Sequence, residues 1–148
     1  MSQVMNGRKV NLPHDWSVGL PYDSISGEGC VAFLQGGIGW YSKSFPTTIS
    51  ANQKCYIVFD GVYNNSEYWI NGKKLGYHPS GYAPFYFDVT DYLNPNEDNR
   101  MTVRVDHSHY ADSRWYTGSG IYRDVKMIVT GQTAYSGLGN ICHYSRGY

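Results

Sequence analysis

Hydrophobic and polar residues alternate along three stretches of the chain. The first runs from Trp40 to Phe45, the second from Met101 to Val105, and the third contains Val125, Met127 and Val129. Successive side chains of a β-strand point to opposite faces, so this alternation predicts three strands with one buried face each. In the third stretch, the three alternate apolar residues form the face that is expected to enter a core.

The strongest local signal is a predicted hairpin around Asn71-Gly72. Runs of β-prone residues flank this dipeptide on both sides. Asn-Gly between two such runs is typical of a two-residue type I′ turn. Around such a turn Tyr68 pairs with Leu75, and we expect both residues to share one face with Ile70.

Two further runs complete the predicted strands. Residues 55–59 form a short apolar run, which predicts a central strand, and residues 85–89 form another strand candidate. No segment shows convincing helical periodicity, and the sequence contains no internal repeat. Seven or so short strands separated by turns predict an all-β fold, a β-sandwich.

Two glycine-containing loops are candidates for function. Residues 17–39 form a long loop with six glycines, and long loops within a compact domain are often functional. In the second loop, residues 113–124, Gly118 and Gly120 allow backbone angles that side chains forbid. A sharp turn there is expected to bring Arg114, Trp115 and Tyr116 onto one rim, at the edge of a ligand site. The alternative is a loop whose aromatic residues simply pack.

Composition narrows the class of function. The chain has 148 residues, which is enough for one domain with a substantial core, and its formal net charge is zero. We therefore expect no nucleic-acid partner, because phosphate binding requires a basic surface. Fifteen tyrosines and four tryptophans favour a carbohydrate context, since aromatic faces stack on sugar rings. Alternatively, these tyrosines only line the surfaces of strands.

Cysteine spacing and hydropathy exclude other classes. Cys30, Cys55 and Cys142 match no zinc pattern, and an odd count is a poor disulfide framework, so free thiols are expected. No apolar run approaches the ~20 residues that cross a bilayer, and residues 1–10 lack the apolar segment of a secretory signal. We expect a soluble chain with no membrane partner, and its localisation stays open.

No complete catalytic or cofactor site is predicted. Glycoside hydrolysis requires two carboxyl groups that flank the scissile bond, and nothing suggests that any two of Glu28, Glu67 and Glu97 converge. His107 and His109 would share one face of a strand, but as a metal pair they are a weak signal, and solvated histidines at a strand end are the alternative. No phosphate-binding glycine loop is present, so no cofactor and no metal are expected.

Five motifs in order resemble the N-terminal domain of glycoside hydrolase family 2, and its β-galactosidase-like members in particular. They lie within residues 8–130. They are Leu12-Pro13-His14-Asp15-Trp16, Gly37-Ile38-Gly39-Trp40-Tyr41, Phe59-Asp60-Gly61-Val62-Tyr63-Asn64-Asn65-Ser66, Trp69-Ile70-Asn71-Gly72, and Ser113-Arg114-Trp115-Tyr116 with Gly120-Ile121-Tyr122-Arg123-Asp124. Each motif alone is weak, but five in the same order are specific.

The resemblance implies a jelly-roll sandwich of the galactose-binding-domain type. In the family this domain precedes an immunoglobulin-like domain and a (β/α)₈ barrel that holds both catalytic glutamates, and it lends loops to the rim of the sugar pocket. The positions that would face the sugar are Asp23 and Arg114, a hydrogen-bond acceptor and a donor. Their alternative roles are a turn cap and a structural salt bridge. We expect Arg123 and Asp124 to hold the loop against the sheet.

The sequence departs from the family at its C-terminal end. We expect the jelly-roll domain to span residues 1–131 and residues 132–148 to form a tail without family character or periodicity. Our hypothesis for the tail is a reading-frame slip: codons exist for residues 133–147 that, read one base later, encode a Trp-Gly-Thr segment of the kind that family members have there. Sequencing the gene tests this hypothesis.

Two functions follow from different classes. The first is a non-catalytic N-terminal sugar-binding domain of a larger family 2 hydrolase, whose partner is a β-galactoside-like carbohydrate and whose apolar docking face allows self-association. The second is a stand-alone carbohydrate-binding module or lectin. A sandwich without any sugar role is a distant third. The sequence does not identify the sugar.

Overall fold

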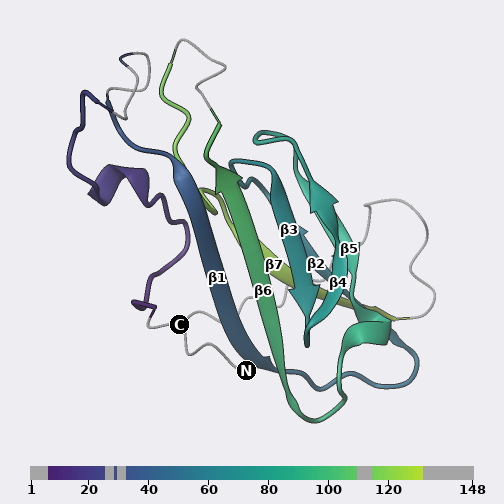
Figure 1. Ribbon diagram of the computed structural model, residues 1–148. Coiled ribbons are helices and arrows are strands. Elements are labelled where there is room, and N and C mark those ends of the chain that lie inside the picture. Colours follow the sequence, from purple (N-terminus) through teal and green to yellow (C-terminus); the bar gives the residue numbers. More distant parts are fainter. Residues whose placement is uncertain (1–6, 26–28, 30–32, 110–114, 132–148) are drawn as a thin grey trace.

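The protein is a sandwich of two antiparallel sheets in the computed structural model, which describes residues 7–25, 29, 33–109 and 115–131 (Figure 1). The first sheet has the strand order β1-β6-β3-β4 and the second has the order β5-β2-β7. The strands are β1 (Gly37–Pro46), β2 (Gln53–Phe59), β3 (Ser66–Ile70), β4 (Lys73–His78), β5 (Phe85–Asp88), β6 (Asp98–His107) and β7 (Val125–Gly131). Two 3₁₀ turns, η1 (Ser17–Gly19) and η3 (Thr90–Tyr92), lie in the loops. The all-β prediction is confirmed.

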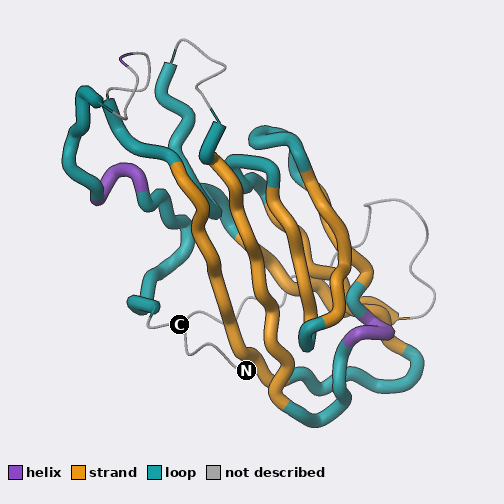
Figure 2. Tube along the Cα trace, viewed as in Figure 1, coloured by secondary structure: helices purple, strands orange, loops and turns teal. Residues whose placement is uncertain are grey.

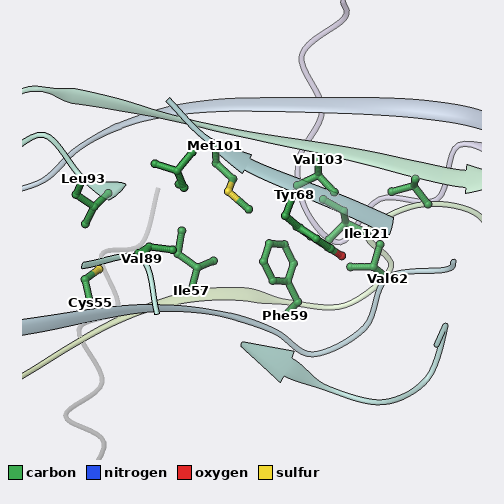
Figure 3. Packing of buried hydrophobic residues seen from close by; sticks show 12 residues of the cluster. Cys55, Ile57, Phe59, Val62, Tyr68, Val89, Leu93, Met101, Val103 and Ile121 are labelled. Atoms are coloured by element: carbon green, nitrogen blue, oxygen red, sulfur yellow. The ribbon is translucent and has the colours of Figure 1, made fainter. Parts of the chain in front are cut away.

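The core lies between the two sheets and follows the predicted alternation. Cys55, Ile57 and Phe59 point inward from β2, and they meet Tyr68 from β3 and Val103 from β6 (Figure 3). The Phe59 and Tyr68 rings lie 4.8 Å apart, and the Tyr68 hydroxyl donates a 2.6 Å hydrogen bond to Ser66 Oγ. Tyr68 is fully buried, so this bond satisfies a polar atom inside the core.

The predicted Asn71-Gly72 hairpin is present, but its register differs from the prediction. Both turn residues have positive φ, 51° and 80°, as a type I′ turn requires. Tyr68 pairs with Gly76 and not with Leu75, because the register shifts by one residue between Tyr68 and Trp69. Leu75 still packs against the core that contains Tyr68 and Ile70, so the shared face is confirmed and the predicted pairing is wrong.

The bulge in this hairpin has a steric reason. A Cβ atom on Gly76 would lie 2.8 Å from Cε1 of Phe87, so the inner face opposite Tyr68 has room only for glycine. Leu75 is the extra residue of β4 at this bulge, and its side chain reaches the core, while the aromatic ring of Phe87 lies over Gly76.

Strand β7 was predicted correctly in position and only partly in burial. Val125 and Val129 pack against the core, as expected. Met127 shares their side of the strand but is 38% exposed, whereas Ile128 on the other side is buried. β7 is an edge strand of its sheet, so the middle of its inner side is less covered than the sequence pattern suggests.

Loops from both halves of the described chain gather at one end of the sandwich. Figure 2 shows the segment that leads into β1 beside the segments that follow β6 and precede β7. The backbone joins them: His14 N–H donates to the Ile121 carbonyl at 2.7 Å, and Trp16 N–H donates to the Ser119 carbonyl at 3.0 Å. This loop end contains the candidate site.

Candidate functional site at the loop end of the sandwich

The loop before β7 takes the sharp turn that its glycines predicted. Gly118 has φ +69° and Gly120 has φ +120°, which is the region of backbone space that favours glycine. Both positions are also crowded. A Cβ on Gly118 would meet Asp15 Oδ2 at 2.6 Å, and one on Gly120 would meet the Tyr41 hydroxyl at 2.2 Å. Glycine is therefore required at both positions for conformation and for space.

Asp15 fixes this loop to the N-terminal segment. Its Oδ1 accepts 2.9 Å hydrogen bonds from the backbone N–H of Ser17 and of Ser119, and its Oδ2 accepts a short bond from the Tyr116 hydroxyl. One carboxylate thus satisfies three donors from two segments about a hundred residues apart in sequence. Burial, together with this bond to Asp15, raises the pKa of the Tyr116 hydroxyl, so Tyr116 stays a donor at neutral pH.

We call Asp15 and its bonds to Ser17, Ser119 and Tyr116 the Asp15 clamp. A chain of hydroxyl groups extends from this clamp to the end of β6. Ser17 Oγ lies 2.8 Å from the Gln35 carbonyl and 2.6 Å from Ser119 Oγ, and Ser119 Oγ lies 2.7 Å from His107 Nδ1. Ser17 has one hydroxyl proton, and only it can be donated to the Gln35 carbonyl. Ser119 must then donate to Ser17, and His107 must donate to Ser119. The hydrogen-bond pattern therefore assigns the proton to Nδ1 of His107.

His14 and Tyr41 form a second polar pair behind the loop. His14 Nδ1 lies 2.9 Å from the Tyr41 hydroxyl. Burial is the largest effect on both groups: it lowers the pKa of His14, with a further lowering by Arg8, and it raises the pKa of Tyr41 to about 12. A neutral imidazole and a neutral phenol therefore face each other at pH 7.

Three aromatic side chains form the exposed rim above this network. Trp115 is 62% exposed, Tyr82 is 53% exposed, and Tyr116 is also exposed. Trp115 Nε1 donates a 3.4 Å hydrogen bond to the Tyr82 hydroxyl, and the Tyr82 ring packs edge-on against the buried Tyr63 at 5.6 Å. We call Trp115, Tyr116 and Tyr82 the aromatic rim. It has the flat apolar faces and hydroxyl groups that suit sugar rings.

Asp23 lies in the long loop and has the contacts of a turn residue. Its Oδ1 accepts a 2.8 Å bond from the Ile25 N–H, and Gln35 Nε2 donates to its Oδ2 at 3.3 Å. Gln35 in turn accepts from Ser17 through its backbone carbonyl, so the loop of Asp23 is tied to the clamp. Arg114, the second predicted site residue, lies outside the described residues. A sugar contact for either residue stays a prediction.

The histidine pair of the sequence does not form a metal site. β6 ends at His107, and His109 lies beyond it in an exposed bend, so the two imidazoles do not share a strand face. The interpretation of both as solvated is wrong for His107, which is half-buried, bonded to Ser119 and packed edge-on against Tyr63 at 4.9 Å. Within the described part of the chain, no three His, Cys, Asp or Glu side chains group as metal ligands.

The family comparison agrees with this geometry. The sequence profile of the family "Glycosyl hydrolases family 2, sugar binding domain" matches residues 29–131. The chain belongs to glycosyl hydrolase family 2. The match covers most of the described residues, including the strands of both sheets and the aromatic rim.

Individual family 2 proteins support the same assignment. The chain is 45% identical over 135 residues to a beta-galactosidase of Bacteroides ovatus, covering 89% of this chain and 16% of that protein. It is 43% identical over 127 residues to a putative beta-glucuronidase of Formosa agariphila, covering 84% of this chain and 12% of that protein. The chain thus spans less than a fifth of the length of these relatives.

Solved structures of family 2 proteins confirm the jelly-roll sandwich. A beta-glycosidase from Bacteroides vulgatus superposes with a TM-score of 0.77 at 46% identity, covering 84% of this chain and 16% of that one. A family 2 member from Bacteroides cellulosilyticus superposes with a TM-score of 0.79 at 37% identity, covering 84% of this chain and 17% of that one.

Two further expectations concern the membrane and the thiols of this family 2 domain. No helix in the described residues is long and apolar enough to span a membrane. Cys55 is a free, buried cysteine, and burial raises the pKa of its thiol to about 11, so it behaves as an inert core residue. The other two cysteines lie outside the described residues.

Sequence reasoning on the residues alone missed most of the clamp. Asp15 appeared only within a family motif, and neither Ser17 nor Ser119 was singled out. The available signal was the joint occurrence of that motif with the two glycines Gly118 and Gly120. Arg123 and Asp124 were expected to hold the loop to the sheet. The Asp124 backbone carbonyl accepts from Asp60 N–H at 3.0 Å, and the Arg123 side chain lies against Gly61, directly after β2.

Proposed function

We propose that this chain is the N-terminal sugar-binding domain of a larger β-glycoside hydrolase, and that the substrate of this hydrolase is a β-galactoside. The observation that carries the proposal is the aromatic rim, which the Asp15 clamp holds at the loop end of a family 2 sugar-binding domain. The rim would form one wall of a pocket, and the catalytic carboxylates would belong to the remainder of the protein.

The acidic residues support a role without catalysis for this domain. Glu67 is bound by Lys74 at 2.5 Å and by Arg104 at 3.2 Å, and the hydrogen bond from Lys74 lowers the pKa of Glu67 most. Such a carboxylate is a poor general acid, because it holds no proton at neutral pH. Glu97 lies in an exposed turn at the opposite end of β6 from the rim, and Glu28 lies outside the described residues.

The roles of the rim residues follow from their chemistry. Trp115 and Tyr82 would stack on the apolar face of a sugar ring, and Tyr116 would orient the loop through Asp15. Asp23 would accept a hydrogen bond from a sugar hydroxyl, and Arg114 would donate one. The first two curated relatives carry the names beta-galactosidase and putative beta-glucuronidase, so the two sugars are the alternatives to be separated.

The test is to sequence the gene beyond codon 148 and to express the complete reading frame. We expect hydrolysis of 4-nitrophenyl β-D-galactoside and little hydrolysis of the β-D-glucuronide. Trp115→Ala should raise KM about tenfold or more with a smaller effect on kcat, because it removes a binding surface and no reacting group. Tyr86→Ala removes a similarly exposed aromatic ring from β5, outside the rim, and serves as the control.

Two results would contradict the proposal. The first is a gene that encodes no hydrolase domain after the described residues, either in the same reading frame or in a frame shifted by one base. Such a gene would show that there is no parent enzyme. Hydrolysis by the 148-residue chain alone would show that the catalytic groups lie here.

A stand-alone lectin is the second candidate, and direct binding separates it from the first. Part of a pocket leaves sugar hydroxyls facing water, so the isolated chain should bind galactose with a Kd of roughly 1 mM or weaker, about −4 kcal/mol. Calorimetric titration with galactose and lactose measures this. Micromolar binding that survives Trp115→Ala, Asp23→Ala and Arg114→Ala would favour the lectin.

A further inference from the structure

We propose that the outer face of the four-stranded sheet carries a second carbohydrate site, separate from the aromatic rim, that binds a neutral oligosaccharide chain along a row of four residues. The row runs across the sheet, one residue per strand: Trp40 on β1, Arg104 on β6, Glu67 on β3 and Tyr77 on β4. We call it the outer row. Each residue is paired directly with the next in the strand register.

The strand register places the outer row on one face of the sheet, across four neighbouring strands. These four strands lie side by side, with the other sheet behind them (Figure 1). Directly paired residues lie on the same face, and neighbouring strands are about 4.8 Å apart, so the backbone positions of Trp40 and Tyr77 are separated by roughly 14 Å. That distance suits an extended oligosaccharide and exceeds the size of a single sugar ring.

The two ends of the outer row are exposed aromatic rings with fixed orientations. Trp40 is 46% exposed and stacks on Trp69 at 5.6 Å with an interplanar angle of 28°. Lys74 Nζ lies 5.8 Å from the centre of the Trp69 ring. Tyr77 is 53% exposed, and its hydroxyl donates a 2.8 Å bond to Asn65 Oδ1. Preorganised rings lose little conformational entropy on binding.

The middle of the outer row is polar and equally fixed. Arg104 donates to Glu67 Oε1 at 3.2 Å and to Asp106 Oδ2 at 2.7 Å, which uses two of its five N–H groups. Both carboxylates have pKa values below their usual range, Glu67 mainly through Lys74 and Asp106 mainly through the Ser108 hydroxyl. The remaining donors of Arg104 and lone pairs of Glu67 lie between the two aromatic ends.

This combination favours a carbohydrate over a protein partner. An apolar protein surface placed on the outer row would remove water from Arg104, Glu67 and Asp106 without replacing its hydrogen bonds, which is costly. Sugar hydroxyls both donate and accept, so they can replace that water while the C–H faces of the rings stack on Trp40 and Tyr77. Around the outer row, the two cations Arg104 and Lys74 are ion-paired with the two anions Glu67 and Asp106, so the row itself carries no net charge and favours a neutral chain.

Affinity gel electrophoresis of the 148-residue chain tests the site, with soluble β-1,4-galactan and hydroxyethylcellulose as neutral probes and polygalacturonate as an acidic one. We expect at least one neutral probe to retard the protein and polygalacturonate to have less effect. Trp40→Leu and Tyr77→Ala should each weaken retardation about tenfold, and Trp40→Tyr should keep most of it, because tyrosine retains a flat aromatic face.

Matched variants separate this site from the rim and from protein docking. Tyr86→Ala, on the outer face of the other sheet, should leave retardation unchanged, and Trp115→Ala should not reproduce the losses of the outer-row variants. Circular dichroism and thermal unfolding identify any variant that is misfolded, in which case Tyr77→Ala and the rescue by Trp40→Tyr decide the result.

Three outcomes would overturn the inference. They are no retardation of the wild type by either neutral probe, equal retardation of Trp40→Leu and Trp40→Tyr, and loss of retardation with Trp115→Ala alone. The last outcome would leave the rim as the binding site and would support the proposed function. A dimer that dissociates on Trp40→Leu, without sugar binding, would assign the outer row to self-association.

Discussion

The two ends of β6 carry polar clusters of opposite chemical character. At its beginning, Asn99 is fully buried and accepts from Asn71 Nδ2 and Asn94 N–H, both at 2.7 Å, while its own amide group donates to two backbone carbonyls. At its end, roughly 27 Å away by strand geometry, His107 joins the cluster of Ser119, Ser17 and Asp15. The first cluster contains only neutral amides, and the second contains a carboxylate and an imidazole.

This difference separates a structural cap from a candidate site. The amide cluster satisfies all four hydrogen-bonding positions of Asn99 and exposes no aromatic ring beside it, so it can contribute stability and little else. The Asp15 cluster uses two positions that only glycine fits, carries titratable groups and presents exposed aromatic residues. Ionisable groups of this kind collect at functional sites.

Removal of the amide cluster around Asn99 should have the largest effect on the free energy of unfolding. Asn99→Ala would leave two backbone carbonyls and two N–H donors without their partner, and we expect the free energy of unfolding to fall by about 3 kcal/mol. Urea unfolding measures this, and the loss should be the same at pH 6 and pH 8. Asn52→Ala, in an exposed turn, is the control. A loss below about 1 kcal/mol would mean that water replaces the amide.

Crowding at the loop end can be separated from backbone strain with two glycine substitutions. Gly72 and Gly118 have similar φ, +80° and +69°, but a Cβ on Gly72 meets nothing within 4 Å. Gly72→Ala should cost about 1 kcal/mol through strain alone, and Gly118→Ala about 2 kcal/mol, because Asp15 must also move. Thermal unfolding compares the two variants. Equal losses would contradict the argument that Asp15 holds its position against the loop.

The pH dependence of the free energy of unfolding should be the smallest of these effects. We expect it to come from two histidines at the loop end. Burial lowers the folded-state pKa of His14 and of His78, the last residue of β4, below the ordinary value of 6.5. The unfolded chain therefore takes up protons at a pH where the folded chain does not, so stability is complete above about pH 6.5 and falls as the pH decreases toward 5.

Urea unfolding at pH 7.5 and pH 5.5 measures this dependence. The double substitution His14→Gln and His78→Gln should reduce it, since the carboxylates with lowered pKa values, Glu67, Asp88 and Asp106, stay ionised over this range. An unchanged slope in the double variant would assign the proton uptake to other groups.

The local parts of this structure could be predicted from the sequence. Asn71-Gly72 specified its turn because these two residues tolerate positive φ better than others do. Cys55, Ile57 and Phe59 specified the inner face of β2 because side-chain alternation is a property of the strand itself. The five family motifs specified the jelly roll, which the solved relatives confirm.

Contacts between distant residues were decided by the tertiary structure. The bulge at Gly76 depends on Phe87 from the other sheet, and the bond from Ser119 N–H to Asp15 joins residues 104 positions apart. The outer row exists because strand order brings β1, β6, β3 and β4 together in one register. Turn dihedrals and strand faces are encoded within a few neighbouring residues. Contacts between distant residues depend on how strands pair and loops close, which no local pattern specifies.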